Sequence, residues 1–149
     1  MRFADLTAGR VIDCGSATLS EQEILDFGRA YDPQPFHTSI ECATSGQWKG
    51  LIASGWQTCG VAMRLVVDAL LADSDSFASP GLEYLKWLAP VRAGDALTLH
   101  ADVIDVRRSA RQPALGILKW RWRLVNQNGA DVLELVATSL FDTATAAGG

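Results

Sequence analysis

Asp32 and His37 are the residues of this chain whose types and spacing are best suited to chemistry. They belong to the segment Asp32-Pro33-Gln34-Pro35-Phe36-His37, in which each proline fixes its own φ angle and keeps the preceding residue out of helical geometry. A carboxylate and an imidazole on such a rigid loop can act as general acid and base near neutral pH. Because Asp-Pro turns are common, the spacing alone also allows a simpler interpretation, in which Asp32 closes a turn and His37 lies on the surface.

A second candidate is the segment Gly50-Leu51-Ile52-Ala53-Ser54-Gly55, which runs directly into a long apolar stretch. If that stretch is a helix, the backbone N–H groups at its start are unpaired and lie at the positive end of the helix dipole, where an oxyanion could bind. The glycines are equally compatible with a chain that merely turns into a helix.

The elements that must position these residues begin with a strand predicted over residues 11–18. The capping box Ser20-Glu21-Gln22-Glu23 then starts a helix that ends near Arg29. A second capping-box pattern, Thr38-Ser39-Ile40-Glu41, places His37 immediately before a short helix that ends near Gly46.

Residues 54–71 contain no proline and are apolar almost all round, apart from a narrow polar stripe at Gln57, Arg64 and Asp68. This pattern predicts a long helix that is enclosed by other elements. The Ser, Asp and Pro residues between 72 and 80 predict a loop after it.

The second half of the chain predicts antiparallel strands, because apolar residues alternate with polar ones over 97–103, 118–124 and 133–141. Turns are expected at 89–94 and at Asn126-Gln127-Asn128-Gly129, and a frayed tail over 142–149. The order of elements indicates an α+β fold in which a curved antiparallel sheet of about five strands wraps around the long helix. Pairing two sheet edges across a dimer would protect them.

The composition narrows the class of protein. A chain of 149 residues, 48% hydrophobic and 20% charged, predicts one compact domain over 1–149. The net charge of −4 provides no positive field for nucleic acid, and no stretch is apolar enough to span a membrane, so the cytoplasm is the expected location. Three cysteines without Cys-x-x-Cys spacing and only two histidines predict neither a disulfide framework nor a metal site.

Three motifs together resemble the MaoC-like dehydratases and R-specific enoyl-CoA hydratases. They are Asp32-x-x-Pro35-x-His37, the 50–55 segment before a long apolar helix, and Pro90-Val91-Arg92-Ala93-Gly94-Asp95. The resemblance runs from about Leu6 to Phe141. It implies the hot-dog fold and a homodimer or larger assembly. It also implies a hydro-lyase of fatty acid metabolism that acts on a coenzyme A or carrier-protein thioester. It implies no cofactor besides that substrate.

In that family an aspartate and a histidine hold and activate water, while a backbone N–H at the start of the central helix binds the thioester oxygen. The resemblance therefore implies Asp32 and His37 as the catalytic pair and the Gly55 amide as the oxyanion donor. The expected substrate-binding residues are Gln34, Pro35, Ser54 and Trp56.

The chain departs from the family pattern in two places. It has Tyr31-Asp32-Pro33-Gln34-Pro35 where Gly-Asp-x-Asn-Pro is usual, and Ser54 where His is frequent. These departures concern the choice of substrate more than the type of reaction.

Two other functions would use the same fold. A hot-dog thioesterase would direct water at the thioester carbonyl, and a non-catalytic subunit would bind the thioester without turnover. The spacing of Asp32 and His37 favours hydration, and two titratable groups are of no use to a pocket that only binds.

Two other groups of residues have open interpretations. Arg107, Arg108 and Arg111 at a predicted hairpin tip could meet coenzyme A phosphates, although a solvated turn is the more common role. Trp48, Trp56 and Trp87 could line an acyl tunnel, or could belong to the core or to an interface.

Overall fold

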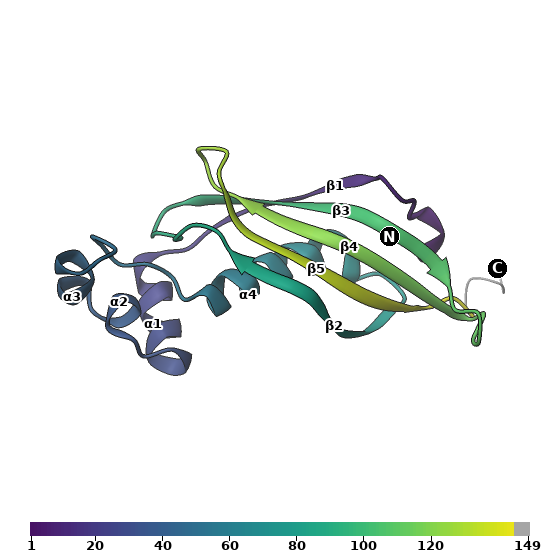
Figure 1. The fold of residues 1–149 in the computed structure, drawn as a ribbon, viewed down its shortest axis with the longest axis horizontal. Coiled ribbons are helices and arrows are strands. Elements are labelled where there is room, and N and C mark those ends of the chain that lie inside the picture. The colour runs from purple at the N-terminus through teal and green to yellow at the C-terminus, as the bar shows by residue number, and fades with distance from the viewer. Residues whose placement is uncertain (145–149) are drawn as a thin grey trace.

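The computed structural model describes residues 1–144, which form an antiparallel sheet with helices on one side (Figure 1). The sheet has five strands in the order β1-β3-β4-β5-β2. The strands are β1 (Val11–Thr18), β2 (Ser76–Trp87), β3 (Ala96–Arg108), β4 (Leu115–Val125) and β5 (Asp131–Asp142). The helices are α1 (Glu21–Tyr31), α2 (Pro35–Thr38), α3 (Ile40–Ser45) and α4 (Gly55–Val66), which continues as a π-helical turn over Val67–Leu71; a 3-10 turn spans Phe3–Asp5.

The core lies between α4 and the face of the sheet that α4 covers (Figure 1). Leu97 and Leu99 of β3 are completely buried, and β4 alternates strictly between buried and half-buried side chains. The alternation predicted for 97–103, 118–124 and 133–141 is therefore confirmed, because each strand turns its apolar side chains toward α4. A curved sheet wrapped around a central helix is the hot-dog fold that the sequence resemblance implies.

The predicted cap of α1 and the predicted turn at 126–129 are confirmed. Ser20 caps α1, and its hydroxyl and the Glu23 carboxylate each accept a backbone N–H. The turn at Asn126–Gly129 joins β4 to β5, with Gly129 at a φ of +76°. The second capping box was assigned one residue too early, because Ser39 rather than Thr38 caps α3. His37 consequently lies inside α2 rather than before a helix.

Two predictions about the middle of the chain were wrong. Residues 72–80 are only partly a loop, since β2 begins at Ser76 and includes Pro80. The strand accepts a proline because β2 is an edge of the sheet and its register with β5 is interrupted between Ala78 and Gly81. The long helix is also not enclosed, because the side chains of Trp56 and Met63 are exposed beside the polar stripe.

The described part of the chain ends just after a well-packed strand, so the prediction of a frayed tail is wrong for residues 142 and 143. Asp142 is the last residue of β5, and Thr143 is buried, where its backbone N–H donates to the Ala114 carbonyl. Residues 145–149 of the tail that the sequence predicts to be frayed lie outside the described residues. No helix within residues 1–144 is long and apolar enough to span a membrane.

A charged cluster occupies the face of the sheet that points away from α4. Asp102 of β3 is only 8% exposed and accepts hydrogen bonds from Arg121 Nε (2.9 Å) and Arg123 Nε (2.8 Å) of the neighbouring strand. The Arg123 hydrogen bond is the largest of the effects that hold the Asp102 pKa below its ordinary value; burial opposes it, and Arg121 adds to it.

We expect Asp102→Ala to lower the free energy of unfolding at pH 7 by about 1.5–3 kcal/mol, because hydrogen bonds to a charged group are lost. A lowered pKa stabilises the fold above the unfolded value, and this contribution disappears as the pH falls through the folded value. The difference between variant and wild type should therefore begin to shrink near pH 3.8, the ordinary pKa, and should be smaller at pH 3 than at pH 7. Urea denaturation at pH 7 and pH 3 measures this, with Asp105→Ala, an exposed carboxylate on the same strand, as the control. An Asp102→Ala loss that is the same at both pH values would contradict the prediction.

Candidate functional site

Asp32 and His37 face each other where α1 meets α2. Asp32 is the C-cap of α1, and Pro35 begins α2 two residues before His37. His37 Nε2 lies 3.2 Å from Asp32 Oδ2, with the imidazole almost completely buried and the carboxylate side chain 20% exposed. The structure thus brings together the two residues that the sequence singled out.

The imidazole of His37 is held by the backbone of the segment before α4. Its Nδ1 lies 2.7 Å from the Ile52 carbonyl oxygen. Because a carbonyl oxygen can only accept, Nδ1 carries the proton, and Nε2 of a neutral His37 presents its lone pair toward Asp32. The ring of Phe36 packs against the imidazole with a centroid separation of 4.5 Å and an interplanar angle of 70°.

Both oxygens of the Asp32 carboxylate accept hydrogen bonds from neighbouring side chains. Gln34 Nε2 donates to Oδ1 (2.7 Å), and the Ser54 hydroxyl donates to Oδ2 (2.8 Å). The Gln34 bond is the largest influence on the Asp32 pKa and lowers it; burial raises it, while Ser54 and His37 lower it further. The net direction is downward, so Asp32 is a carboxylate at neutral pH.

These bonds show what the two departures from the family pattern do in this chain. Ser54 is completely buried and its hydroxyl is directed at Asp32, so it contacts the catalytic candidate rather than the cavity. Gln34 does both, since it lines the cavity and bonds to Asp32.

A cavity of about 410 Å³ opens beside the pair and is called the site cavity here. Asp32, Gln34 and His37 line it, as does Gly55, the first residue of α4. The wall is completed mainly by Trp48, Trp56 and Trp87, together with the 88–91 segment. Pro35 is not part of this wall; it is the first residue of α2.

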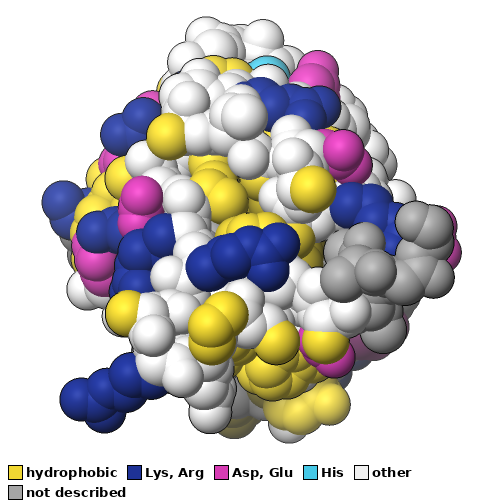
Figure 2. Space-filling view, turned by 90° about the vertical axis from the view of Figure 1, so that its right-hand side faces the viewer, with side chains coloured by type: hydrophobic (Ala, Val, Ile, Leu, Met, Phe, Trp, Pro, Cys, Tyr) yellow, Lys and Arg dark blue, Asp and Glu magenta, His cyan; other side chains and the backbone are white. Residues whose placement is uncertain are grey.

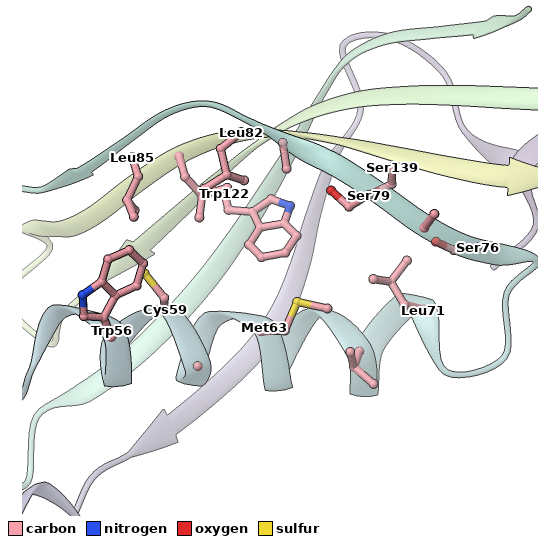
Figure 3. Close-up of a pocket in the computed structure, with 15 residues that line it drawn as sticks. Trp56, Cys59, Met63, Leu71, Ser76, Ser79, Leu82, Leu85, Trp122 and Ser139 are labelled. Carbon is pink, nitrogen blue, oxygen red and sulfur yellow. The ribbon is translucent and has the colours of Figure 1, made fainter. Parts of the chain in front are cut away.

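A second cavity of about 590 Å³, called the apolar cavity here, lies between α4 and the strands β2, β4 and β5 (Figure 3). Trp56 lines both cavities. Its ring meets the ring of Trp87 edge to face, with centroids 5.2 Å apart. The Trp56–Trp87 pair therefore stands at the boundary between the two.

Two contributors to the site were missed by sequence reasoning. The Ile52 carbonyl is a backbone group, so the residue type at position 52 does not indicate its role. Gly28, however, lies inside a helix, where glycine costs about 1 kcal/mol relative to alanine, and such a glycine signals close packing. A Cβ on Gly28 would lie 2.7 Å from the His37 carbonyl oxygen and 3.0 Å from the His37 Cβ. Gly28 thus allows α2 to approach α1.

We expect Gly28→Ala to lower the free energy of unfolding by about 1–3 kcal/mol, because the new methyl group meets backbone that cannot move freely. Gly60→Ala is the matched control, since Gly60 is also helical but a Cβ there would meet none of the described residues within 4 Å. That substitution should instead stabilise by about 0.5–1 kcal/mol. Urea denaturation of both variants gives the comparison, and a stabilising Gly28→Ala would be inconsistent with the packing described here.

The arginines that could have met coenzyme A phosphates lie elsewhere. Arg107, Arg108 and Arg111 are at the β3–β4 end of the sheet, opposite the end that carries α1 and α2 (Figure 1). Figure 2 looks at that end and shows its Lys and Arg side chains spread over separate places rather than gathered in one patch. Arg108 Nη1 donates to the Pro113 carbonyl (3.0 Å), which favours the interpretation as a structural turn.

Within residues 1–144, no three His, Cys, Asp or Glu side chains are grouped so that they could hold a metal ion. The three cysteines are free thiols; Cys14 is buried, Cys59 half-buried and Cys42 exposed.

Comparison with known proteins connects this geometry to a family. The family model described as a MaoC-like domain matches residues 5–118. An uncharacterised protein, YdeM of Bacillus subtilis, is 29% identical over 90% of this chain and 94% of its own length.

Solved structures agree with this match. A MaoC-like dehydratase from Rhodospirillum rubrum is 32% identical and superposes with a TM-score of 0.86 over 93% of this chain and 94% of its own. The R-hydratase PhaJ1 from Pseudomonas aeruginosa shares the fold, with a TM-score of 0.75 at 19% identity over 94% of this chain and 84% of its own. With the family match and the 32% identical relative covering most of its length, this chain belongs to the MaoC-like family, a family of hydratases and dehydratases.

Proposed function

We propose that this protein catalyses the reversible addition of water to the double bond of an enoyl thioester. The observation that carries the proposal is the approach of Asp32 Oδ2 to His37 Nε2 across 3.2 Å, at the wall of the site cavity. The family supports the reaction class. The substrate we propose is a coenzyme A or carrier-protein thioester, and the chemistry below uses no cofactor besides it.

Hydration places a hydroxyl group on Cβ and a proton on Cα. A water molecule can donate one hydrogen bond to the Asp32 carboxylate and one to His37 Nε2, since both atoms are acceptors. As the water oxygen bonds to Cβ, Nε2 takes a proton from the water, and the π electrons shift onto the thioester oxygen. The His37 imidazolium, stabilised by the Asp32 charge, then gives that proton to Cα. Dehydration is the same sequence in reverse.

The negative charge that develops on the thioester oxygen needs a preorganised donor. Gly55 is the first residue of α4, where backbone N–H groups have no partner inside the helix and the helix dipole is positive. A donor in such a position lowers a barrier by about 3 kcal/mol. In this proposal the Gly55 amide binds the thioester oxygen, and the apolar cavity beyond Trp56 takes the acyl chain.

The test follows the enoyl-thioester absorbance of crotonyl-CoA and of a longer enoyl-CoA while free thiol is monitored. Loss of the absorbance without thiol release is the expected result. Release of thiol would instead make the protein a thioesterase. Tight binding of the thioester with no change in either signal would make it a binding subunit without turnover.

We also propose that two copies of the chain associate through β2. This strand is an edge of the sheet, so its outer backbone groups are free for pairing with a second β2. Exposed apolar side chains accompany the edge, namely Phe77, Leu82 and Trp87 on or beside β2 and Trp56 and Met63 on α4. Light scattering after gel filtration should give twice the mass of the 16.0 kDa chain, and Leu82→Lys should shift it toward one chain. A monomeric wild type would exclude this interface.

A further inference from the structure

The apolar cavity contains one feature that a plain hydrocarbon chain would not use. Its walls are mostly apolar and come from α4 and from β2, β4 and β5, with Trp56 and Cys59 at one end and Leu71 and Ser76 at the other (Figure 3). Its volume of about 590 Å³ is in the range of small-molecule pockets, which combine apolar walls with a few well-placed polar groups. The inference below rests on the function proposed above, because it concerns the acyl part of the same substrate.

Trp122 supplies that polar group. Its side chain extends from β4 into the apolar cavity and is only 6% exposed (Figure 3). Its indole Nε1 has no hydrogen-bond acceptor within residues 1–144. An N–H group that is buried without an acceptor loses its bond to water and gains nothing in return, and such groups are rare in folded proteins.

The neighbouring tryptophan shows how this strand satisfies an indole when the fold provides the acceptor. Trp120 lies two residues earlier on β4 and is also buried, and its Nε1 donates to Ser139 Oγ across 3.1 Å. Ser139 is two residues beyond Ala137, the residue paired with Trp120 in the sheet. Trp122 is paired with Leu135, so Ala137 occupies the corresponding position and offers no side-chain acceptor. Two buried tryptophans on the same strand therefore differ in that the Trp120 N–H has an acceptor and the Trp122 N–H has none within residues 1–144.

The other polar side chains of the cavity lie on the same side as the Trp122 nitrogen. In Figure 3 this nitrogen faces the part of the cavity that carries Ser79 and Ser139. The Ser79 hydroxyl is already used, since it donates to the Thr138 carbonyl (2.6 Å). Ser139 Oγ accepts from Trp120, and the Trp122 N–H is a buried donor of the cavity wall that has no acceptor within residues 1–144.

We propose that Trp122 selects acyl thioesters whose chain carries an oxygen acceptor, a keto or hydroxyl group, beyond the reacting carbons. The apolar walls take the hydrocarbon part of such a chain, and the Trp122 N–H donates to its oxygen. A hydrocarbon chain of the same length fills the cavity but leaves the donor unpaired, so it binds less well.

The test measures binding rather than turnover. Saturated acyl-CoAs carry no double bond to hydrate, so their dissociation constants can be measured by calorimetry whether or not the protein is a hydratase. A series with a keto group at successive carbons is compared with the plain acyl-CoA of equal length. At one or more positions we expect the keto compound to bind roughly 3- to 10-fold more tightly, the size of one hydrogen bond between neutral groups.

Matched variants assign the preference to one indole. Trp122→Phe should abolish it, whereas Trp120→Phe, which removes an indole that already has a partner, should retain it. Wild-type protein labelled with ¹⁵N-tryptophan gives an independent readout, because its five indole signals can be observed directly. The Trp122 signal should move downfield with the keto compound and less with the plain one, even if Trp122→Phe fails to fold.

Equal affinity for every pair of ligands would overturn the inference, as would a preference that survives Trp122→Phe. A Trp122 signal that changes with protein concentration but not with ligand would also overturn it, because a second copy would then fill the cavity. The proposed function fails separately: a keto preference without hydration of any enoyl-CoA leaves this inference standing, and hydration without a keto preference leaves only the function standing.

Discussion

Replacing His37 with alanine is expected to lower kcat/KM for enoyl-thioester hydration by about 10²- to 10⁴-fold, the usual contribution of a positioned acid and base. In the proposed mechanism Nε2 both takes the proton from water and returns it to Cα, so no other group in the pair can replace it. The Ile52 carbonyl keeps the second ring nitrogen protonated and therefore keeps Nε2 available.

His100→Ala is the matched control for this prediction. His100 is the only other histidine, and it lies half-buried on β3 outside the site cavity. Its substitution should leave the rate unchanged. Steady-state assays of both variants, with circular dichroism to confirm folding, make the comparison. A folded His37→Ala variant with the wild-type rate would remove His37 from the mechanism.

Replacing Asp32 with asparagine should cost a similar factor of about 10²- to 10⁴-fold in kcat/KM, although the side chain keeps its size. The charge that stabilises the His37 imidazolium is lost, and the amide no longer offers two acceptor oxygens to Gln34 and Ser54. Because Asp32 and His37 act as one unit, the double variant should be no slower than the slower single variant. Losses that multiply in the double variant would mean that the two residues act independently.

The pH dependence of stability gives a second readout for Asp32. Its pKa is lowered in the folded protein, chiefly by Gln34, so its carboxylate stabilises the fold above the unfolded pKa. That contribution disappears as the pH falls through the folded value. Asp32→Asn should therefore be less stable than wild type at pH 7, and this difference should begin to shrink near pH 3.8 and disappear only below the folded pKa. Asp26→Asn, which changes an exposed carboxylate of α1, is the control.

Short-range patterns in the sequence were sufficient for much of this protein. The alternation in 118–124 predicts which side chains of β4 are buried, because a strand exposes its faces with a period of two whatever it packs against. Ser20 and Glu23 predict the start of α1, because the cap and the N–H groups it binds lie within one turn. The Asp32 to His37 segment could be identified for the same reason, since its prolines act on adjacent residues.

The same local rules were wrong where contacts between distant parts of the chain determine the structure of a segment. Serines and Pro80 predict a loop over 72–80, but pairing with β5 makes the later part of it the edge strand β2. The apolar pattern of 54–71 predicts an enclosed helix, yet Trp56 and Met63 remain exposed because the sheet covers only part of α4.

By itself, then, the sequence determined the strand faces, the cap of α1, the Asp32 and His37 candidates and, through resemblance, the family. Only the tertiary structure decided that Ile52 sets the protonated nitrogen of His37 and that Ser54 and Gln34 hold Asp32. It also decided that the Trp122 indole has no acceptor among residues 1–144. Most of these contacts join residues that are far apart along the chain, 15 positions for His37 and Ile52 and 22 for Asp32 and Ser54. Residue type and periodicity describe neighbours within a turn or a strand, whereas the partner of a buried polar atom depends on how α1, α4 and the sheet pack together.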